Sequence, residues 1–147
     1  MIRALLSMLK MIRGEVNMKL GYVIIYVPDV AATVAFYERA FGLARRFVHE
    51  SGHYAEMETG ATALAFAAEE LVSSTVQNFR RNRARERRAA GAEIAFVTAD
   101  VAKSFGHALA AGAAPVAGPV QKPWGQTVSY VRDCNGFLVE ICSEVAA

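Results

Sequence analysis

The sequence contains two copies of one pattern, and this repeat constrains the fold more than any other feature. An apolar run, an aspartate and an amphipathic stretch at residues 22–41 recur at residues 93–112, a shift of 71 residues. The matched pairs are Tyr22 with Glu93, Asp29 with Asp100, Val30 with Val101, and Val34 with Phe105. The later segments repeat at a slightly larger shift, as TGATALAFA and NGFLVEICS. Such a repeat predicts two copies of one supersecondary unit that bury their apolar faces against each other.

The first copy predicts a strand, a helix and three further strands. Residues 20–27 (LGYVIIYV) are rich in β-branched and aromatic residues, which favours a strand. Asp29 follows Pro28 and is placed to cap a helix by accepting backbone N–H groups of its first turn. That helix has one apolar face and is expected to end at Gly42. Three further strands are predicted at 45–49, 54–58 and 63–67.

The second copy predicts the same order of elements. A strand at 93–98 precedes Asp100, which is the expected cap of a helix that ends near Gly112. The pair Asn135-Gly136 favours a tight hairpin, because both residues tolerate positive φ. The strands after the helix are predicted at 115–116, 127–132 and 137–141. The predicted organisation is an extension (1–17) and one domain (18–147), which comprises module one (18–70), a connector (71–92) and module two (93–147).

Residues 1–17 do not belong to the repeat. Their apolar side chains recur at helical spacing, at Ile2, Leu5, Leu6, Leu9 and Ile12. Lys10 interrupts this run and no small-residue cleavage site follows, which argues against a signal peptide. We expect either a non-essential extension or a helix that packs on the domain, and Met18 is an alternative start. No run in the chain approaches the roughly 20 apolar residues of a membrane span, so we expect no membrane partner.

The connector contains the strongest charge feature. Residues 80–88 (RRNRARERR) carry six arginines and one glutamate, so this segment has a charge of +5 and the remainder of the chain −3. A solvated connector is the favoured interpretation. Nucleic-acid binding is disfavoured because Phe79 is the only aromatic residue next to the arginines. A third possibility is that the segment is an arm that folds over the cup to bind an anionic substrate. Two cysteines are too few for a disulfide framework, which predicts reduced thiols and a cytoplasmic location.

Two stretches of sequence resemble a known superfamily. They are YVPDVAATVAFYERAFG, at residues 26–42, and PWGQTVSYVRDCNGFLVEI, at residues 123–141. Together with the repeat they resemble the vicinal oxygen chelate superfamily of glyoxalases, bleomycin-resistance proteins and extradiol dioxygenases. The resemblance implies an α+β fold in which two β-α-β-β-β modules form a cup-shaped, curved mixed sheet with the helices outside. It also implies a small-molecule ligand in the cup and a homodimer, sometimes with modules paired across chains.

The resemblance further implies a site at four positions, on the first and last strands of each module. These positions are Tyr22, Ala65, Glu93 and Glu140. Strand alternation supports their placement on one face, opposite the apolar residues that suit the helices. Of these four residues, only Glu93 and Glu140 are good metal ligands. A hard divalent cation such as Mg²⁺ accepts two carboxylates and water. A zinc or iron site would normally need imidazole nitrogen. The candidates to complete the set are His49, His53 and Glu56.

Two functions therefore remain open. The first is a metal-free protein that binds a small organic molecule, with Glu93 and Glu140 as anchors for a cationic or hydroxyl-rich ligand. The expected lining residues are Tyr22, Ile24, Tyr26, Trp124, Tyr130 and Leu138. The alternative is a divalent-metal-dependent lyase or isomerase, similar to lactoylglutathione lyase, in which either glutamate is a catalytic base or a metal ligand. Whether the protein is an enzyme stays undecided, and an extradiol dioxygenase is disfavoured because the four positions include no histidine.

Overall fold

The computed structural model describes residues 1–12, 14 and 17–146, in which helices and strands follow the order of the predicted repeat. The helices are α1 (Ile2–Ile12), α2 (Val30–Phe41), α3 (Glu69–Ser73) and α4 (Val101–Ala110). The strands of module one are β1 (Tyr22–Val27), β2 (Arg45–Val48), β3 (Tyr54–Met57) and β4 (Ala63–Ala68). Those of module two are β5 (Glu93–Val97), β6 (Ala114–Gln121), β7 (Thr127–Arg132) and β8 (Leu138–Cys142). The predicted α+β class with two β-α-β-β-β modules is confirmed.

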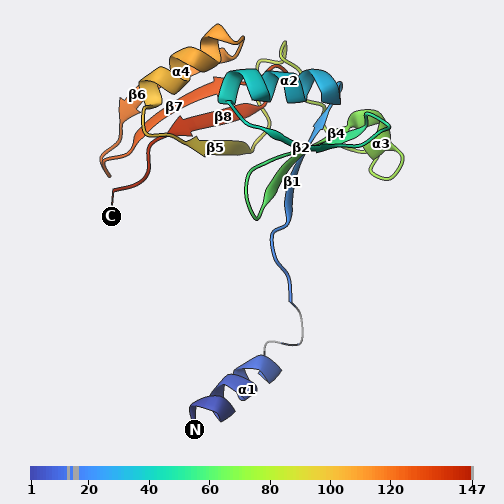
Figure 1. Cartoon of the computed structure of the whole chain (residues 1–147), viewed down its shortest axis with the longest axis vertical. Helices are drawn as coiled ribbons and strands as arrows, with labels where there is room; N and C mark the ends of the chain where they lie inside the picture. The colour runs from blue at the N-terminus through green and yellow to red at the C-terminus, as the bar shows by residue number, and fades with distance from the viewer. Residues whose placement is uncertain (13, 15–16, 147) are drawn as a thin grey trace.

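Module one is a mixed four-stranded sheet in the order β1-β4-β3-β2, with α2 across one face (Figure 1). Strands β1 and β4 are parallel and the other pairs antiparallel. The predicted cap is present, since Asp29 Oδ1 accepts from the Ala32 N–H at 2.9 Å. Gly42 ends α2 at a φ of 68°, which glycine adopts without steric cost. The apolar side of β1 is buried under α2, with Ile25 4% and Val27 0% exposed.

Module two repeats this arrangement in the order β5-β8-β7-β6, with α4 over one face. Asp100 caps α4 through a 3.0 Å hydrogen bond from the Lys103 N–H. The alternation predicted for the last strand is observed, because Val139 and Ile141 are buried in the core. Strand β6 extends to Gln121 and is therefore much longer than the predicted 115–116, because it pairs with β7 through two register shifts.

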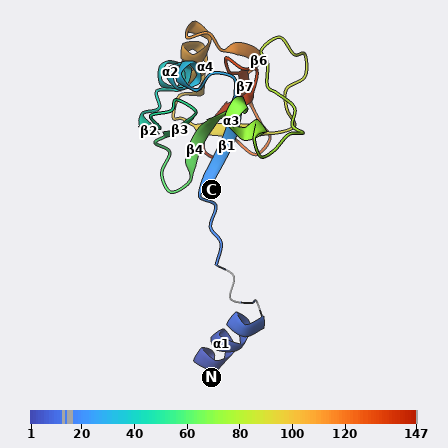
Figure 2. The same ribbon diagram turned by 90° about the vertical axis from the view of Figure 1, so that its right-hand side faces the viewer.

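The two modules join through their helices, which lie side by side above the sheets (Figures 1 and 2). Beneath them, the Tyr37 hydroxyl of α2 donates a 2.7 Å hydrogen bond to Asp133 Oδ2, in the turn before β8. Asn135 Nδ2 donates to Thr33 Oγ1 at 2.9 Å and adds a second polar link. Phe41 and Phe96 pack with ring centroids 5.1 Å apart. The core is therefore continuous across the junction, and the chain forms two four-stranded sheets, not one continuous sheet.

Helix α1 extends away from both sheets (Figures 1 and 2). Its apolar side chains at Leu5, Leu6 and Leu9 are exposed, so the expected packing of this helix on the domain is not observed. Residues 13, 15 and 16 of the predicted extension, and Ala147 of module two, lie outside the described residues. Among the helices that the structure describes, none has the length and hydropathy required to cross a membrane.

Removing the Tyr37 hydroxyl should weaken the junction between the modules. In Tyr37→Phe, the buried Asp133 carboxylate loses a hydrogen bond that spans the two modules. We expect the free energy of unfolding to fall by about 1–3 kcal/mol, measured by urea denaturation. The matched control is Tyr54→Phe, which removes a half-buried hydroxyl bound to Glu56 within module one and should cost less than about 1 kcal/mol. Equal losses in the two variants would contradict this role.

Candidate functional site

Each sheet has a face turned away from its helix, which we call its open face. On the open face of module one, Tyr22 is 56% exposed and Ile24 45% exposed, in contrast to the buried Ile25 and Val27. Alternation along a strand explains the difference, because successive side chains point to opposite faces. Tyr26 lies on the same face, where its ring packs edge-on against Phe79 of the connector, with centroids 5.1 Å apart. Three of the predicted lining residues therefore share one open face.

The open face of module two carries a cluster of acidic and phenolic groups. Tyr130 and Glu140 are directly opposite in the β7–β8 pair, and the Tyr130 hydroxyl donates to Glu140 Oε2 at 3.3 Å. Glu93 lies on the neighbouring strand β5, next to Glu140. Its pKa is raised from the ordinary 4.5 by partial burial, and further by the hydrogen bond and negative charge of Glu140. The two predicted carboxylates therefore meet in one cluster that retains a proton to higher pH than an isolated glutamate.

Neighbouring groups respond to the same negative charge. The pKa of Tyr130 is raised by burial and then by the charges of Glu140 and Glu93. Burial, followed by the hydrogen bond to Glu140, raises the pKa of Cys142 to about 11. A thiol with this pKa is protonated near neutral pH, so Cys142 is not an activated nucleophile. Tyr130 keeps its proton and remains a hydrogen-bond donor.

A second polar group, Glu56, lies on the open face of module one, an orientation that the sequence analysis does not specify. Glu56 is opposite Ala65 in the β3–β4 pair and accepts a 3.0 Å hydrogen bond from the Tyr54 hydroxyl. Burial and this carboxylate raise the pKa of Tyr54 to about 12. Arg46 approaches Glu56 at 3.8 Å while its main partner is Glu58, at 2.6 Å. The alternation of polar and apolar letters in YAEM, at residues 54–57, was the signal for this placement.

The predicted site residues fall into two groups that one chain does not bring together. Tyr22, Ile24, Tyr26 and Ala65 belong to the first sheet, whereas Glu93, Tyr130, Leu138 and Glu140 belong to the second. Trp124 joins neither group. It lies in the turn between β6 and β7, 56% exposed, where its Nε1 donates to Gln126 Oε1 at 2.9 Å.

The described residues do not offer one chain a conventional metal site. No group of three or more His, Cys, Asp or Glu side chains with suitable proximity occurs in residues 1–12, 14 and 17–146. His49 is tied to Ser51 in a turn, its Nδ1 lying 2.8 Å from the hydroxyl, and His107 contacts the Arg39 carbonyl oxygen at 2.8 Å. Glu93 and Glu140 alone supply two carboxylates, and burial together with the charge of Glu140 raises the pKa of Glu93. Three-ligand metal coordination does not fit this arrangement within one chain.

Comparison with known proteins places this arrangement in a family. The family model of the Glyoxalase/Bleomycin resistance protein/Dioxygenase superfamily matches residues 19–141. The chain belongs to this superfamily. The resemblance inferred from the sequence motifs is thereby confirmed for the whole two-module region. No individually curated protein sequence matches the chain.

Solved structures of the superfamily share the fold of this member. A glyoxalase-related enzyme from Fulvimarina pelagi is similar with a TM-score of 0.74 and 20% identity, over 87% of this chain and 89% of the other. A glyoxalase/bleomycin resistance protein/dioxygenase family enzyme from Burkholderia phytofirmans PsJN has a TM-score of 0.72 and 24% identity, over 88% and 100%. TioX from Micromonospora sp. ML1 has a TM-score of 0.63 and 22% identity, over 86% and 98%. At these identities the likeness establishes the superfamily fold alone.

Replacing Glu93 should change how stability depends on pH. A carboxylic acid whose pKa is raised by folding stabilises the fold below its unfolded pKa, and this contribution is lost as pH rises through the folded value. In Glu93→Gln that loss is absent, so the variant should become more stable than wild type as pH rises above about 4.5. Because Glu93 is largely solvated, we expect the Tm of Glu93→Gln to exceed that of wild type by only about 1–3 °C at pH 7.

Thermal unfolding between pH 4 and pH 8 measures this difference. The matched control is Glu50→Gln, which neutralises an exposed carboxylate in the turn after β2. Two results would argue against repulsion between Glu93 and Glu140. One is a Tm difference between Glu93→Gln and wild type that does not change with pH. The other is a pH dependence equal to that of Glu50→Gln.

Proposed function

We propose that this superfamily member binds a small organic molecule that carries a positive charge or several hydroxyl groups. The observation that carries the proposal is the cluster of Glu93, Glu140 and Tyr130 on an open sheet face. The negative charge of Glu140 contributes to raising the pKa of Glu93, and a bound cation would relieve the repulsion between the two ionised carboxylates. The Tyr130 hydroxyl is fixed by Glu140 and helps to orient the carboxylate.

The proposal includes a homodimer, in which a second copy closes the cup. Ligand sites are usually concave and largely apolar, whereas each open face of a single copy has only one wall. Exposed apolar side chains lie on both faces, with Tyr22 and Ile24 on β1 and Val97 on β5. Pairing module one of one copy with module two of another would set Tyr22 and Ile24 opposite Glu93 and Glu140. Exposed apolar surface of this kind is typical of interaction sites.

The carboxylates of the cluster make ligand binding depend on pH. Protonation of Glu93 removes negative charge from the face, so a cationic ligand is held more weakly as pH falls through the raised pKa of Glu93. Apolar parts of the ligand would lie against Ile24 and Leu138. Free thiols at Cys134 and Cys142 support the proposed cytoplasmic location, where thiols remain reduced.

Loss of the Glu140 charge should abolish preference for cationic ligands. A thermal-shift screen of cationic aromatic compounds against neutral analogues of the same shape should raise the Tm of wild type mainly with the cations. Glu140→Gln should weaken binding of the best compound by about tenfold, whereas Glu50→Gln should leave it unchanged. Light scattering of the complex should give the mass of two chains. Equal affinity for cations and neutral analogues, or a monomeric complex, would overturn the respective parts of the proposal.

The alternative function is a divalent-metal-dependent lyase or isomerase similar to lactoylglutathione lyase. The adjacency of Glu93 and Glu140 favours it, because hard divalent cations accept carboxylate oxygens and water. Among the described residues no third His, Cys, Asp or Glu completes a group with these two, and Glu56 on the open face of module one is a carboxylate that a second copy could contribute. A metal bound there would polarise a substrate carbonyl.

Metal content distinguishes the two functions. For the metal-free binder, protein purified without chelator should contain less than about 0.1 metal ion per chain, and divalent ions should not shift its Tm. A near-stoichiometric metal in wild type that is lost in Glu140→Ala, but retained in Glu50→Ala, would establish the metal-dependent alternative. Elemental analysis by mass spectrometry and divalent-ion titration provide the measurement.

A further inference from the structure

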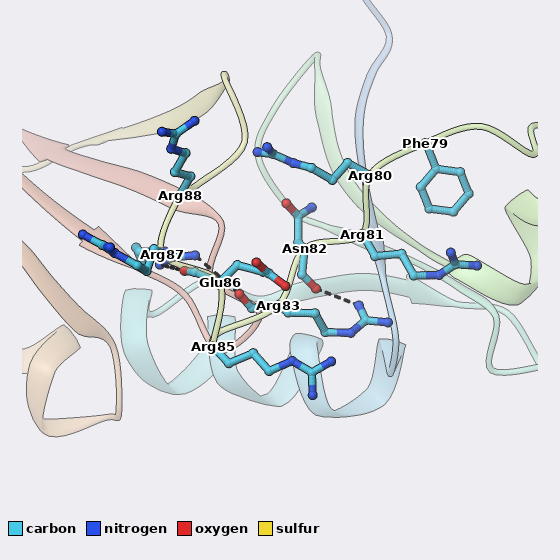
Figure 3. Close-up of a pocket in the computed structure, with 10 residues that line it drawn as sticks. Phe79, Arg80, Arg81, Asn82, Arg83, Arg85, Glu86, Arg87 and Arg88 are labelled. Carbon is cyan, nitrogen blue, oxygen red and sulfur yellow. Dashed lines mark hydrogen bonds between the residues drawn. The ribbon is translucent and has the colours of Figure 1, made fainter.

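The connector forms a structured loop around a positively charged pocket, which we call the arginine pocket. Its cavity has a volume of about 780 Å³, and seven of the ten residues that line it are arginines. Six come from residues 80–88 (Figure 3). The seventh is Arg132, at the end of β7. None of the lining residues belongs to the Glu93–Glu140–Tyr130 cluster. The pocket is therefore a separate feature of opposite charge.

The loop is anchored to module one through buried and aromatic contacts. Arg83 donates to both carboxylate oxygens of Glu69, at 2.6 and 2.9 Å, and Glu69 is only 7% exposed. Arg81 reaches the same carboxylate at 3.4 Å. Phe79 packs on Tyr26 of β1, which ties the start of the arginine run to the sheet. Bidentate pairs of this kind fix the guanidinium geometry.

Arg132 anchors the other side of the loop to module two. Its Nε donates to the Gly136 carbonyl oxygen at 2.7 Å, and its Nη1 to the Glu86 carbonyl oxygen. A side chain at position 136 would lie 2.5 Å from the Arg83 carbonyl oxygen, so glycine is required for this close approach. The loop is therefore held between the two modules, while most of its arginine side chains stay exposed to solvent.

Several arginines of the arginine pocket make no hydrogen bond or ion pair within the part of the chain that the structure describes. The side chains of Arg85, Arg87 and Arg88 form no hydrogen bond or ion pair with any other residue that the structure describes. Glu69 and Glu86 are the two carboxylates in or against the pocket, which leaves an excess of five positive charges. Like charges that line one pocket repel each other, and a bound polyanion reduces that repulsion.

We propose that the arginine pocket binds a small molecule with two or more phosphate groups. Guanidinium groups match phosphate oxygens through paired, charge-assisted hydrogen bonds, and Arg85 and Arg88 are available for them. The volume of the cavity lies within the range of small-molecule sites. A nucleic acid fits less well, since Phe79 is already packed against Tyr26 and the chain beyond residues 80–88 carries −3.

Inorganic tripolyphosphate tests the proposal on the full chain by isothermal titration calorimetry at an ionic strength of about 0.15 M. Wild type should bind one tripolyphosphate per chain. Arg85→Gln/Arg88→Gln should lower the affinity at least tenfold, about 1.4 kcal/mol. The control Lys19→Gln/Lys103→Gln removes the same net charge from exposed positions outside the pocket and should change the affinity less than about twofold.

Three outcomes would overturn the proposal. They are the absence of saturable binding, an equal loss in the lysine control, and tighter binding of citrate or of a thymidine oligonucleotide of about 20 residues than of tripolyphosphate. The last would assign the pocket to carboxylates or nucleic acid instead. Should Arg85→Gln/Arg88→Gln lower the Tm of the free protein, Arg87→Gln/Arg88→Gln repeats the test with another unpartnered pair. The result does not depend on whether the cup binds a ligand.

Discussion

The hydrogen bond between Tyr37 and Asp133 defines how the two modules are joined. Tyr37 is fully buried at the centre of the aromatic packing around α2, and Asp133 organises the turn before β8 by accepting from the Asn135 and Phe137 N–H groups. Burial and the nearby carboxylate hold the pKa of Tyr37 well above its ordinary value, so the hydroxyl stays a donor. One contact thus fixes both the hairpin of module two and its position against module one.

Joining the modules through their helices leaves the opposite faces of both sheets open. The same faces carry the acidic cluster of module two and the tyrosine-rich surface of module one, so the geometry that buries the core also divides the candidate site. A second copy is the simplest way to oppose the two surfaces. The arginine pocket differs, because one chain completes it by drawing the connector between Glu69 of module one and Arg132 of module two.

Sequence patterns predicted the local features of the site, because strand alternation and helix capping depend on neighbouring residues. The predicted shared face of Tyr22 and Ile24, and that of Glu140 and Leu138, follow from the two-residue period of a strand. The same period places Glu56 on the open face of module one, opposite Ala65. The structure adds the position of Trp124, which lies in the turn between β6 and β7 and donates to Gln126 Oε1.

The sequence by itself determined the family, the two modules and the facing of most site residues, since the repeat, the caps at Asp29 and Asp100, and the Asn135-Gly136 turn act over short distances. Only the tertiary structure decided which groups meet. The bond between Tyr37 and Asp133 and the partnership of Arg83 with Glu69 were not anticipated from the sequence. Nor was the division of the site between two sheets. These contacts depend on how the connector folds against module one and how α2 packs against α4, which no local spacing records.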